Sequence, residues 1–182
     1  MSVTLEHKTY QIELKDAITV ADAAIDAVYE PDADKQFKPS ARTLITVFEN
    51  ELKKAAVLLQ AAGGATGVSE DSILIIGDQL ITRCCNYLFS LSIPDLKLNW
   101  LTKADDAACF SLLPYENDLI VHGEISISRI DATGNIVWQF TGSDIFLSLD
   151  GNSTFDMYPD FIELTDFNGH RYQVDYYGQQ IG

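Results

Sequence analysis

The sequence predicts a mainly β protein, in which an antiparallel meander of about three to four repeated units follows a short N-terminal strand and helix. Trp100 and Trp138 lie 38 residues apart, and an aspartate stands six residues after each of them, at Asp106 and Asp144. From residue 72 onward, short runs of apolar and polar residues are separated by turn residues, as in successive strands. A chain of 182 residues suits one structural domain.

The N-terminal residues 1–41 are expected to form an elaboration of a repeat body at residues 42–182. Residues 3–14 alternate in part and predict a strand. Asp16–Tyr29 predicts a helix that begins at an N-capping aspartate. Glu30–Ala41 contains two prolines and many charges, and is expected to be a loop. The helix prediction depends on apolar residues at helical spacing: Ile18, Ala21, Ile25 and Val28.

The repeat body begins with a predicted strand at Arg42–Phe48. Residues 52–62 are ambiguous, because they are rich in helix formers and are followed by Gly63–Gly64, which could cap a helix. The preceding Glu-Asn-Glu looks like a hairpin turn, so we favour a strand here. This choice makes the chain one meander from residue 43 onward.

The loop Gly63–Gly67 is rich enough in glycine to approach a ligand closely. It lacks the Lys-Ser/Thr sequel and the following helix of a phosphate-binding loop. We therefore do not expect it to bind phosphate.

Short predicted strands fill the rest of the chain from Ser72. Turn sequences such as Pro-Asp, Ala-Thr-Gly-Asn and Phe-Asn-Gly-His separate them. Strands that follow one another without an intervening helix must pair antiparallel. Three to four strands in each 38-residue unit match one small sheet of a radial repeat.

The segments "SLSIPDLKLNWLTKADD" and "SRIDATGNIVWQFTGSD" resemble the PQQ-like and WD40-like blade unit of β-propellers, in which a strand, a tight turn with Asp or Gly, and a strand with Trp recur. The resemblance covers roughly residues 70–180. It implies a propeller-like fold and a scaffold role, with no cofactor. It also leads us to expect a family of small bacterial proteins. The chain has no Trp-Asp dipeptide and fewer clear repeats than a closed ring needs.

Acidic residues dominate the chain, whose formal charge is −15. Residues 104–182 hold 13 acidic residues and only Arg129 and Arg171 as basic ones, a net charge of −11. Such a field repels nucleic-acid phosphates and anionic lipids, so we expect no nucleic-acid and no membrane partner. It favours a basic partner or cations, or simply keeps a sheet-rich protein soluble. Without a signal peptide or a long apolar run, we expect a cytoplasmic protein.

Three aspartates are the first candidates for a site. Asp106 and Asp144 are equivalent in the repeat, and Asp105 adds a third carboxylate. If the repeats pack side by side, these residues share one rim, where they could bind a cation, act as acid and base, or contact a partner. The alternative is that they accept backbone hydrogen bonds in turns.

The cysteines and histidines give weaker signals. Cys84 and Cys85 are adjacent and should point to opposite faces of a strand, so reduced, partly buried thiols are expected. His122 stands at the repeat position of Cys84, and the two could approach one another as a nucleophile–base pair. A zinc site from Cys84, Cys109 and His122 lacks any recognised ligand spacing.

Most aromatic residues occupy repeat-equivalent strand positions and are expected in the core. Adjacent Tyr176 and Tyr177 cannot both point inward. We therefore expect an exposed tyrosine beside acidic residues, Tyr177, to contact a protein partner.

These features favour a non-enzymatic protein-interaction module with an acidic face, whose predicted contact residues are Asp106, Asp144 and Tyr177. One specific form is an immunity-type inhibitor of a basic protein, because acidity speeds association with such a partner. Self-association through an open edge strand is a further option. The alternative function is a small-ligand or metal-binding protein, or an enzyme, that uses the carboxylate rim of Asp105, Asp106 and Asp144.

Overall fold

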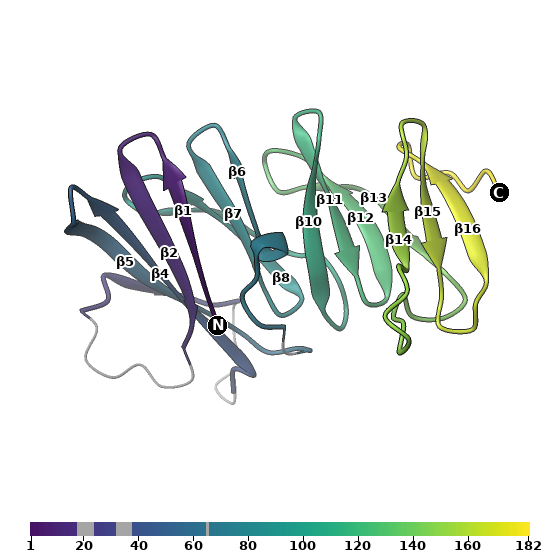
Figure 1. Cartoon of the computed structure of the whole chain (residues 1–182), viewed down its shortest axis with the longest axis horizontal. Coiled ribbons are helices and arrows are strands. Elements are labelled where there is room, and N and C mark those ends of the chain that lie inside the picture. The colour runs from purple at the N-terminus through teal and green to yellow at the C-terminus, as the bar shows by residue number, and fades with distance from the viewer. Residues whose placement is uncertain (18–23, 32–37, 65) are drawn as a thin grey trace.

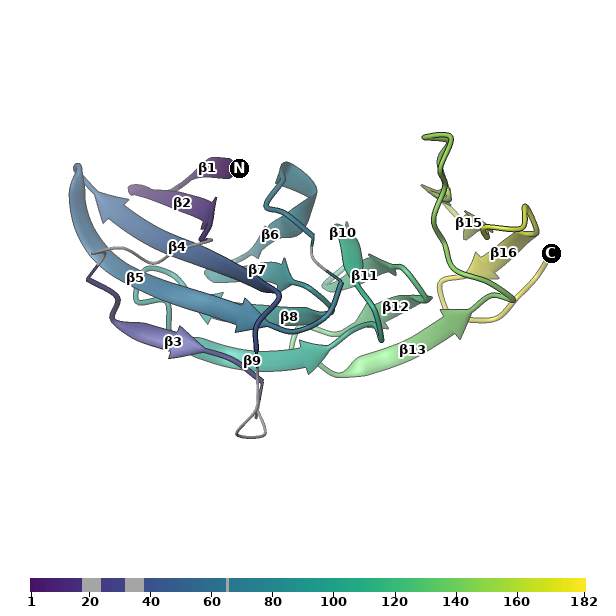
Figure 2. The same cartoon turned by 90° about the horizontal axis from the view of Figure 1, so that it is seen from below.

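The computed structural model describes residues 1–17, 24–31, 38–64 and 66–182. In this part of the chain, the strands form four sheets that follow one another in chain order, here called blades 1–4. Figure 1 shows the blades side by side, and Figure 2 shows that they curve into an open arc with blades 1 and 4 at opposite ends. The expected mainly β class, built from antiparallel repeats, is confirmed.

Blade 1 has five strands in the order β1-β2-β4-β5-β3, and β3 alone runs parallel to its neighbour. The N-terminal segment belongs to this sheet, since β1 and β2 extend it on one side and β3 on the other. The boundary expected between residues 41 and 42 falls at the start of β4. The strands are β1 (Ser2–His7), β2 (Tyr10–Asp16), β3 (Ala27–Tyr29), β4 (Ala41–Glu49) and β5 (Leu52–Ala61).

The helix expected at Asp16–Tyr29 is wrong where the structure describes these residues. Asp16 ends β2 and Ala27–Tyr29 form β3, while residues 18–23 lie outside the described residues. The backbone of β3 pairs with Val57–Leu59 of β5. This tertiary pairing outweighs the weak local preference that the helical spacing indicates.

The strand that we favoured for residues 52–62 is confirmed as β5, which pairs with β4. Asn50 and Glu51 form the connecting turn, with φ angles of 51° and 66°. Two consecutive left-handed residues give a tight hairpin turn whose twist suits antiparallel strands. The turn and the pairing with β4 therefore hold helix-forming residues in a strand.

Blades 2 and 3 each have four antiparallel strands in chain order, and blade 4 has three. Among the described residues, no helix is long and apolar enough to cross a membrane. The elements of blade 2 are the 3-10 turn η1 (Glu70–Ser72), β6 (Ile73–Ile76), β7 (Gln79–Cys84), β8 (Tyr87–Ser92) and β9 (Leu98–Lys103). Blade 3 contains β10 (Cys109–Tyr115), β11 (Asp118–Gly123), β12 (Ser126–Ile130) and β13 (Ile136–Thr141), and blade 4 contains β14 (Phe155–Met157), β15 (Phe161–Thr165) and β16 (Arg171–Asp175).

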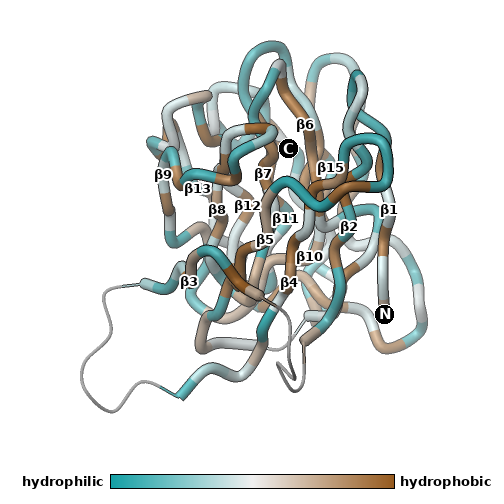
Figure 3. Tube along the Cα trace, turned by 90° about the vertical axis from the view of Figure 1, so that its left-hand side faces the viewer, coloured by the Kyte–Doolittle hydropathy of each residue, from teal (hydrophilic) through white to brown (hydrophobic). Residues whose placement is uncertain are grey.

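Three apolar layers fill the spaces between neighbouring blades. Figure 3, seen from the blade 1 end, shows apolar residues along the strands and hydrophilic residues at many turns. Because blades 2 and 3 each have a neighbour on both sides, they contribute to two layers. Fully buried members are Ile45 and Phe89 between blades 1 and 2, Leu88 and Val121 between blades 2 and 3, and Ile127 and Leu164 between blades 3 and 4.

Blade 4 has one apolar face and one polar face. Ile162, Leu164 and Val174 are fully buried against blade 3. The paired residues Glu163 and Gln173 alternate with them in sequence and point the other way. The outward face of blade 4 is therefore compatible with contact with water.

Each repeated tryptophan joins its own blade to the next one. The indole Nε1 of Trp100 donates to the carbonyl of Ala132 at 3.1 Å, and that of Trp138 donates to the carbonyl of Tyr176 at 2.9 Å. Both acceptors lie in Asp-x-x-Gly turns that end in Gly134 and Gly178 respectively. Tryptophan thus recurs after 38 residues because the same contact between neighbouring blades is repeated.

The turn glycines should be essential to this contact. A Cβ atom at Gly178 would lie 2.6 Å from the Trp138 ring, and its φ is 84°. We expect Gly178→Ala to destabilise the protein by about 1–3 kcal/mol more than Gly169→Ala. Gly169 is the matched control, because it has the same φ of 84° and nothing within 4 Å of the added Cβ. Urea unfolding measures both, and equal losses would contradict the proposed packing role.

Candidate functional site

Asp105 is a buried acceptor between blades 2 and 3. Its Oδ1 accepts hydrogen bonds from the backbone N–H groups of Ala107 and Ala108, at 2.7 and 3.1 Å. Its Oδ2 accepts from the N–H groups of Ile125 and Ser126 and from the Ser126 hydroxyl, at 2.9–3.1 Å. Five donors occupy both oxygens, so Asp105 holds the loop before β10 against the start of β12.

Asp106 and Asp144 are equivalent in the repeat but differ in their surroundings. Asp106 is exposed and forms an ion pair with Lys103 at 2.6 Å. Asp144 accepts the N–H of Ile145 at 2.8 Å and the side-chain amide of Asn168 at 2.6 Å. Within the described ranges, no group of three or more His, Cys, Asp and Glu residues is placed to hold a metal ion. The three aspartates therefore do not form such a metal-holding group among these residues.

A second buried carboxylate, Asp166, joins blades 3 and 4. It accepts hydrogen bonds from the hydroxyls of Ser143 and Tyr172, both at 2.8 Å, and from the N–H of His170 at 2.9 Å. Burial alone would raise the pKa of Asp166, but these hydrogen bonds outweigh it and lower the pKa below its usual range. The carboxylate thus stays ionised as a structural acceptor.

Ser143, His170 and Asp166 have the residue types of a catalytic triad without its geometry. A triad histidine uses one ring nitrogen for the serine and the other for the aspartate. Here the same atom, His170 Nδ1, lies 3.2 Å from Ser143 Oγ and 3.2 Å from Asp166 Oδ2. Ser143 donates to Asp166 instead, so no proton relay is set up.

The cysteines and His122 are distributed over three different layers. Cys84 and Cys85 lie between blades 1 and 2, Cys109 lies between blades 2 and 3, and His122 lies between blades 3 and 4. The Cys84–His122 pair and the zinc site considered above are therefore not assembled. All three cysteines are free and buried.

Our expectation that Cys84 and Cys85 point to opposite faces is wrong. Both belong to the same apolar layer. Cys85 lies in the turn after β7 and has a φ of 56°, so regular strand alternation ends at Cys84. The turn geometry brings two adjacent thiols to one side of the sheet.

His122 is a half-buried, neutral imidazole. Its ring stacks on Phe155 with centroids 4.9 Å apart and meets Phe110 edge-on at 5.3 Å. Burial lowers the pKa of His122 to about 4. This side chain packs between blades 3 and 4 and carries no charge near neutral pH.

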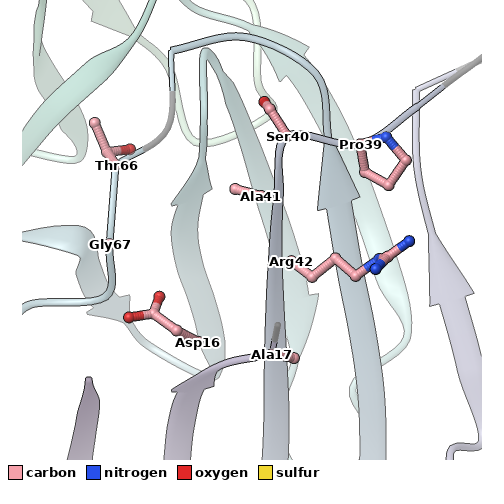
Figure 4. Close-up of a pocket in the computed structure, with 8 residues that line it drawn as sticks. All are labelled: Asp16, Ala17, Pro39, Ser40, Ala41, Arg42, Thr66 and Gly67. Atoms are coloured by element: carbon pink, nitrogen blue, oxygen red, sulfur yellow. The ribbon is translucent and has the colours of Figure 1, made fainter. Parts of the chain in front are cut away.

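A half-open cleft of about 350 Å³ lies between the end of β2 and the start of β4. Figure 4 shows Thr66, Gly67 and Asp16 on one side and the β4 segment that begins near Ser40 on the other. Arg42 points away from Asp16, and its Nε donates to Gln60 at 3.3 Å. The cleft is lined by Asp16, Ala17, Pro39, Ser40, Ala41, Arg42, Thr66 and Gly67.

Arg83 is a buried cation beside this region, with 6% of its surface exposed. Its Nη2 donates to the carbonyl of Gly67 at 3.2 Å and to the Ser69 hydroxyl at 3.3 Å. Its Nε and Nη1 have no hydrogen-bond partner among the described residues, and no carboxylate pairs with it there. An uncompensated buried charge is costly and stabilises negative charge nearby.

Aromatic and acidic residues gather at one end of blades 3 and 4. Tyr115 stacks on Tyr176 with ring centroids 4.1 Å apart, and the Tyr176 hydroxyl donates to the carbonyl of Tyr158 at 2.6 Å. Tyr158 in turn stacks on Phe161 at 4.8 Å. The turns that carry these residues lie along the upper edge of Figure 1. We define the tyrosine patch as Tyr115, Glu116, Tyr158, Asp160, Phe161 and Tyr177.

Tyr177 is the most exposed ring of the tyrosine patch, at 80%. Its neighbour Tyr176 is buried, as expected for one of two adjacent tyrosines. Burial and then the charge of Glu116 raise the pKa of Tyr115, so this hydroxyl is neutral at physiological pH. Sequence reasoning identified Tyr177 but missed its companions, which come from separate turns and meet only in the folded chain.

Comparisons with known proteins place the fold. BamB from Moraxella catarrhalis has a TM-score of 0.53 and 17% identity over 78% of this chain and 45% of that chain. The Cps50 (Swd1) β-propeller domain from Myceliophteria thermophila has a TM-score of 0.47 and 12% identity, over 78% of this chain and 53% of that one. The computationally designed Ika8 protein has a TM-score of 0.47 and 9% identity, over 98% and 59%.

The chain spans about half the length of these structures. Similarity to BamB, a β-propeller protein, supports the propeller-like fold that the blade resemblance implied. At this identity the similarity concerns the fold alone. No protein-family model and no curated protein matches the sequence.

Asp105 should matter for stability, and Asp106 should not. Asp105→Asn replaces one acceptor oxygen with an N–H₂ group that faces backbone donors, so we expect a loss of about 2–4 kcal/mol in the free energy of unfolding. Asp106→Asn removes the same charge from an exposed pair and should change it by less than about 0.5 kcal/mol. Urea unfolding of both variants tests this prediction. If Asp105→Asn leaves the free energy of unfolding unchanged, the structural role of Asp105 is refuted.

His122 should make stability depend on pH. Its folded pKa of about 4 lies below the value of about 6.5 in an unfolded chain, so the unfolded state gains a proton first as the pH falls. The stabilisation is present above pH 6.5 and is lost towards pH 4, on the order of 3 kcal/mol. His122→Phe should flatten the stability curve in this window. Thermal unfolding measures the stability of the unmodified protein and of His122→Phe at each pH. If stability changes with pH in the same way in both, His122 is not the cause of the pH dependence.

Proposed function

We propose that this chain is a non-enzymatic interaction module that binds a basic protein segment through the tyrosine patch. The observation that carries the proposal is that exposed aromatic rings and exposed carboxylates meet on one surface, where Glu116 lies 3.7 Å from the Arg129 guanidinium. Tyr177 is 80% exposed, Tyr158 is 44% exposed, and the Glu116 side chain is 67% exposed. Tyrosine is enriched at protein interfaces, because it buries a large rigid area and keeps a polar end.

The charge balance of the surrounding surface supports a basic partner. Arg129 is engaged, because its Nε donates to Asp118 at 2.7 Å and its Nη1 donates to the carbonyl of Tyr176 at 3.0 Å. Residues 104–182, all of which the structure describes, contain only Arg171 as a further basic side chain. A surface of this kind attracts a cationic partner from a distance and raises its association rate.

The patch already accommodates one cation of the kind that a basic partner would bring. The Arg129 guanidinium carbon lies 4.7 Å from the centroid of the Tyr115 ring. A second guanidinium could stack in the same way on the exposed ring of Tyr177 while Glu116 accepts its hydrogen bonds. This chemistry favours arginine-rich segments over lysine-rich ones. The planar guanidinium stacks on an aromatic ring and can donate two hydrogen bonds to one carboxylate, and an ammonium group cannot do both.

A binding role also fits the use of the polar residues described above. Asp105 and Asp166 have their oxygens occupied by protein donors, and Cys84 is remote from His122. The immunity-type inhibitor is the specific form of this proposal, in which the basic partner is a toxin. Self-association through the edge strands β9 or β13 is the competing form of interaction.

Binding of an arginine-rich peptide tests the patch directly. We expect an arginine nonamer to bind more tightly than a lysine nonamer, and a glutamate nonamer not to bind. Tyr177→Ser and Glu116→Lys should each weaken arginine-peptide binding about tenfold, because each removes one anchor of the patch. Calorimetric titration at low and high salt measures the effect, with binding weakening steeply as salt rises.

Matched controls lie in the β4–β5 hairpin at the far end of the arc (Figure 1). Glu51→Lys makes the same charge change as Glu116→Lys, and Leu52→Ser removes an exposed side chain as Tyr177→Ser does. Both controls should bind as the unmodified protein does. If patch and control variants lose affinity for the arginine peptide equally, the effect is due to net charge and not to the patch. An affinity that does not change with salt would overturn the proposal. A size measurement at the same concentrations detects self-association.

A further inference from the structure

We infer that Cys84 and Cys85 form an oxidation site, in which a hydroperoxide converts the two adjacent thiols into a disulfide. The inference goes beyond the proposed function and does not depend on it. It rests on the placement of the two thiols, on the cleft beside them and on the buried cation near them.

The two thiols share one small region between blades 1 and 2. The left-handed φ of Cys85 turns its side chain to the side on which Cys84 lies, and both residues belong to the same apolar layer. The Cys84 sulfur lies 3.7 Å from the carbonyl oxygen of Ala41, and the Cys85 sulfur lies 3.5 Å from that of Ala61. The paired strands β4 and β5 thus hold both sulfur atoms against the same backbone pair.

The cleft provides an approach to these buried thiols. Ser40 and Ala41 form one wall of the cleft (Figure 4). The same two residues contact the thiols from behind, since Ser40 Oγ lies 3.3 Å from the Cys85 sulfur and Ala41 accepts from Cys84. Ser40 and Ala41 therefore contact both the cleft and the two sulfur atoms, and the cleft is large enough for a peroxide molecule.

The environment assigns different roles to the two sulfur atoms. Interaction with the neighbouring Cys84 thiol, then with the Ser40 hydroxyl and the charge of Arg83, lowers the pKa of Cys85 against the effect of its burial. Interaction with the Cys85 thiol and burial raise the pKa of Cys84. We therefore assign Cys85 as the attacking thiol and Cys84 as the resolving thiol.

The chemistry needs only hydrogen peroxide, named here as the oxidant. The Cys85 thiolate attacks one peroxide oxygen, an S–O bond forms, the O–O bond breaks, and the departing hydroxide takes a proton from solvent. The Cys84 sulfur then attacks the Cys85 sulfenic acid, an S–S bond forms, and the hydroxyl leaves as water with the Cys84 proton. The thiol pair supplies two electrons, and the peroxide becomes two water molecules.

Oxidation at this place would act on the junction between blades 2 and 3. The turn at Cys85 and Asn86 accepts three backbone hydrogen bonds from the next connection: Cys109 N–H to Cys85 at 2.9 Å, Ala104 N–H to Asn86 at 2.9 Å, and Asp105 N–H to Asn86 at 3.3 Å. A bond between adjacent cysteines would change the turn that presents these carbonyls. We therefore expect the oxidised protein to melt a few degrees lower than the reduced one, roughly the shift that a loss of about 1 kcal/mol produces.

Mass spectrometry after mild peroxide treatment tests the site. Cleavage after Arg83 and Lys97 places Cys84 and Cys85 on one peptide, and Cys109 falls on another. After peroxide treatment and then alkylation of the unfolded protein, the first peptide should carry no alkyl group. Its mass should be lower by two hydrogens than that of the reduced, unalkylated peptide. We expect its oxidation to be at least about tenfold faster than that of Cys109, whose pKa burial raises.

Two variants separate the proposed roles, and a third is the control. Cys84→Ser should stop at a sulfenic acid on Cys85 that a dimedone probe traps, and Cys85→Ser should slow oxidation of Cys84 to the rate of Cys109. Cys109→Ser should oxidise as the unmodified protein does. If either thiol variant fails to fold, the wild-type peptide map still decides. Full alkylation of Cys84 and Cys85 after peroxide, oxidation of Cys109 at the same rate, or disulfides between molecules would each overturn the inference.

Discussion

The contact between one blade and the next is the constraint on which this structure depends. A three- or four-stranded sheet cannot bury an apolar face alone, so each blade needs a neighbour. Trp100 and Trp138 provide a directional part of that contact, because each ring lies on a glycine turn while its N–H reaches a turn carbonyl. Asp105 and Asp166 complete it by satisfying backbone and side-chain donors that packing would otherwise leave buried and unpaired.

The use of polar residues inside the junctions explains where binding can occur. A carboxylate with both oxygens occupied has little capacity for a cation or a substrate, and this is the state of Asp105. Carboxylates and rings outside the junctions stay available, and Glu116 and Tyr177 are among the exposed ones. The outward face of blade 4 is polar, and the turns beside it carry the tyrosine patch.

The sequence predicted the features that follow from a local period. Strand alternation from residue 72 and the spacing of Trp100 and Trp138 predicted the blades, and adjacent Tyr176 and Tyr177 predicted one exposed ring. Features set by tertiary pairing or by one backbone angle were not predictable in this way. The pairing of β3 with β5 replaced a predicted helix, and the left-handed turn at Cys85 reversed the expected direction of its thiol. Asp105 looked like its neighbour Asp106, and only the fold separates a buried acceptor from an exposed ion pair.

The central claim is that contacts between blades, rather than the sheets themselves, hold the arc together, and differential scanning calorimetry tests it most directly. If the junctions couple all four blades, the protein should unfold in one transition whose calorimetric enthalpy equals its van't Hoff enthalpy. Two or more transitions, or a calorimetric enthalpy well above the van't Hoff value, would show that blades unfold independently. That result would contradict an arc held by the tryptophan and carboxylate links.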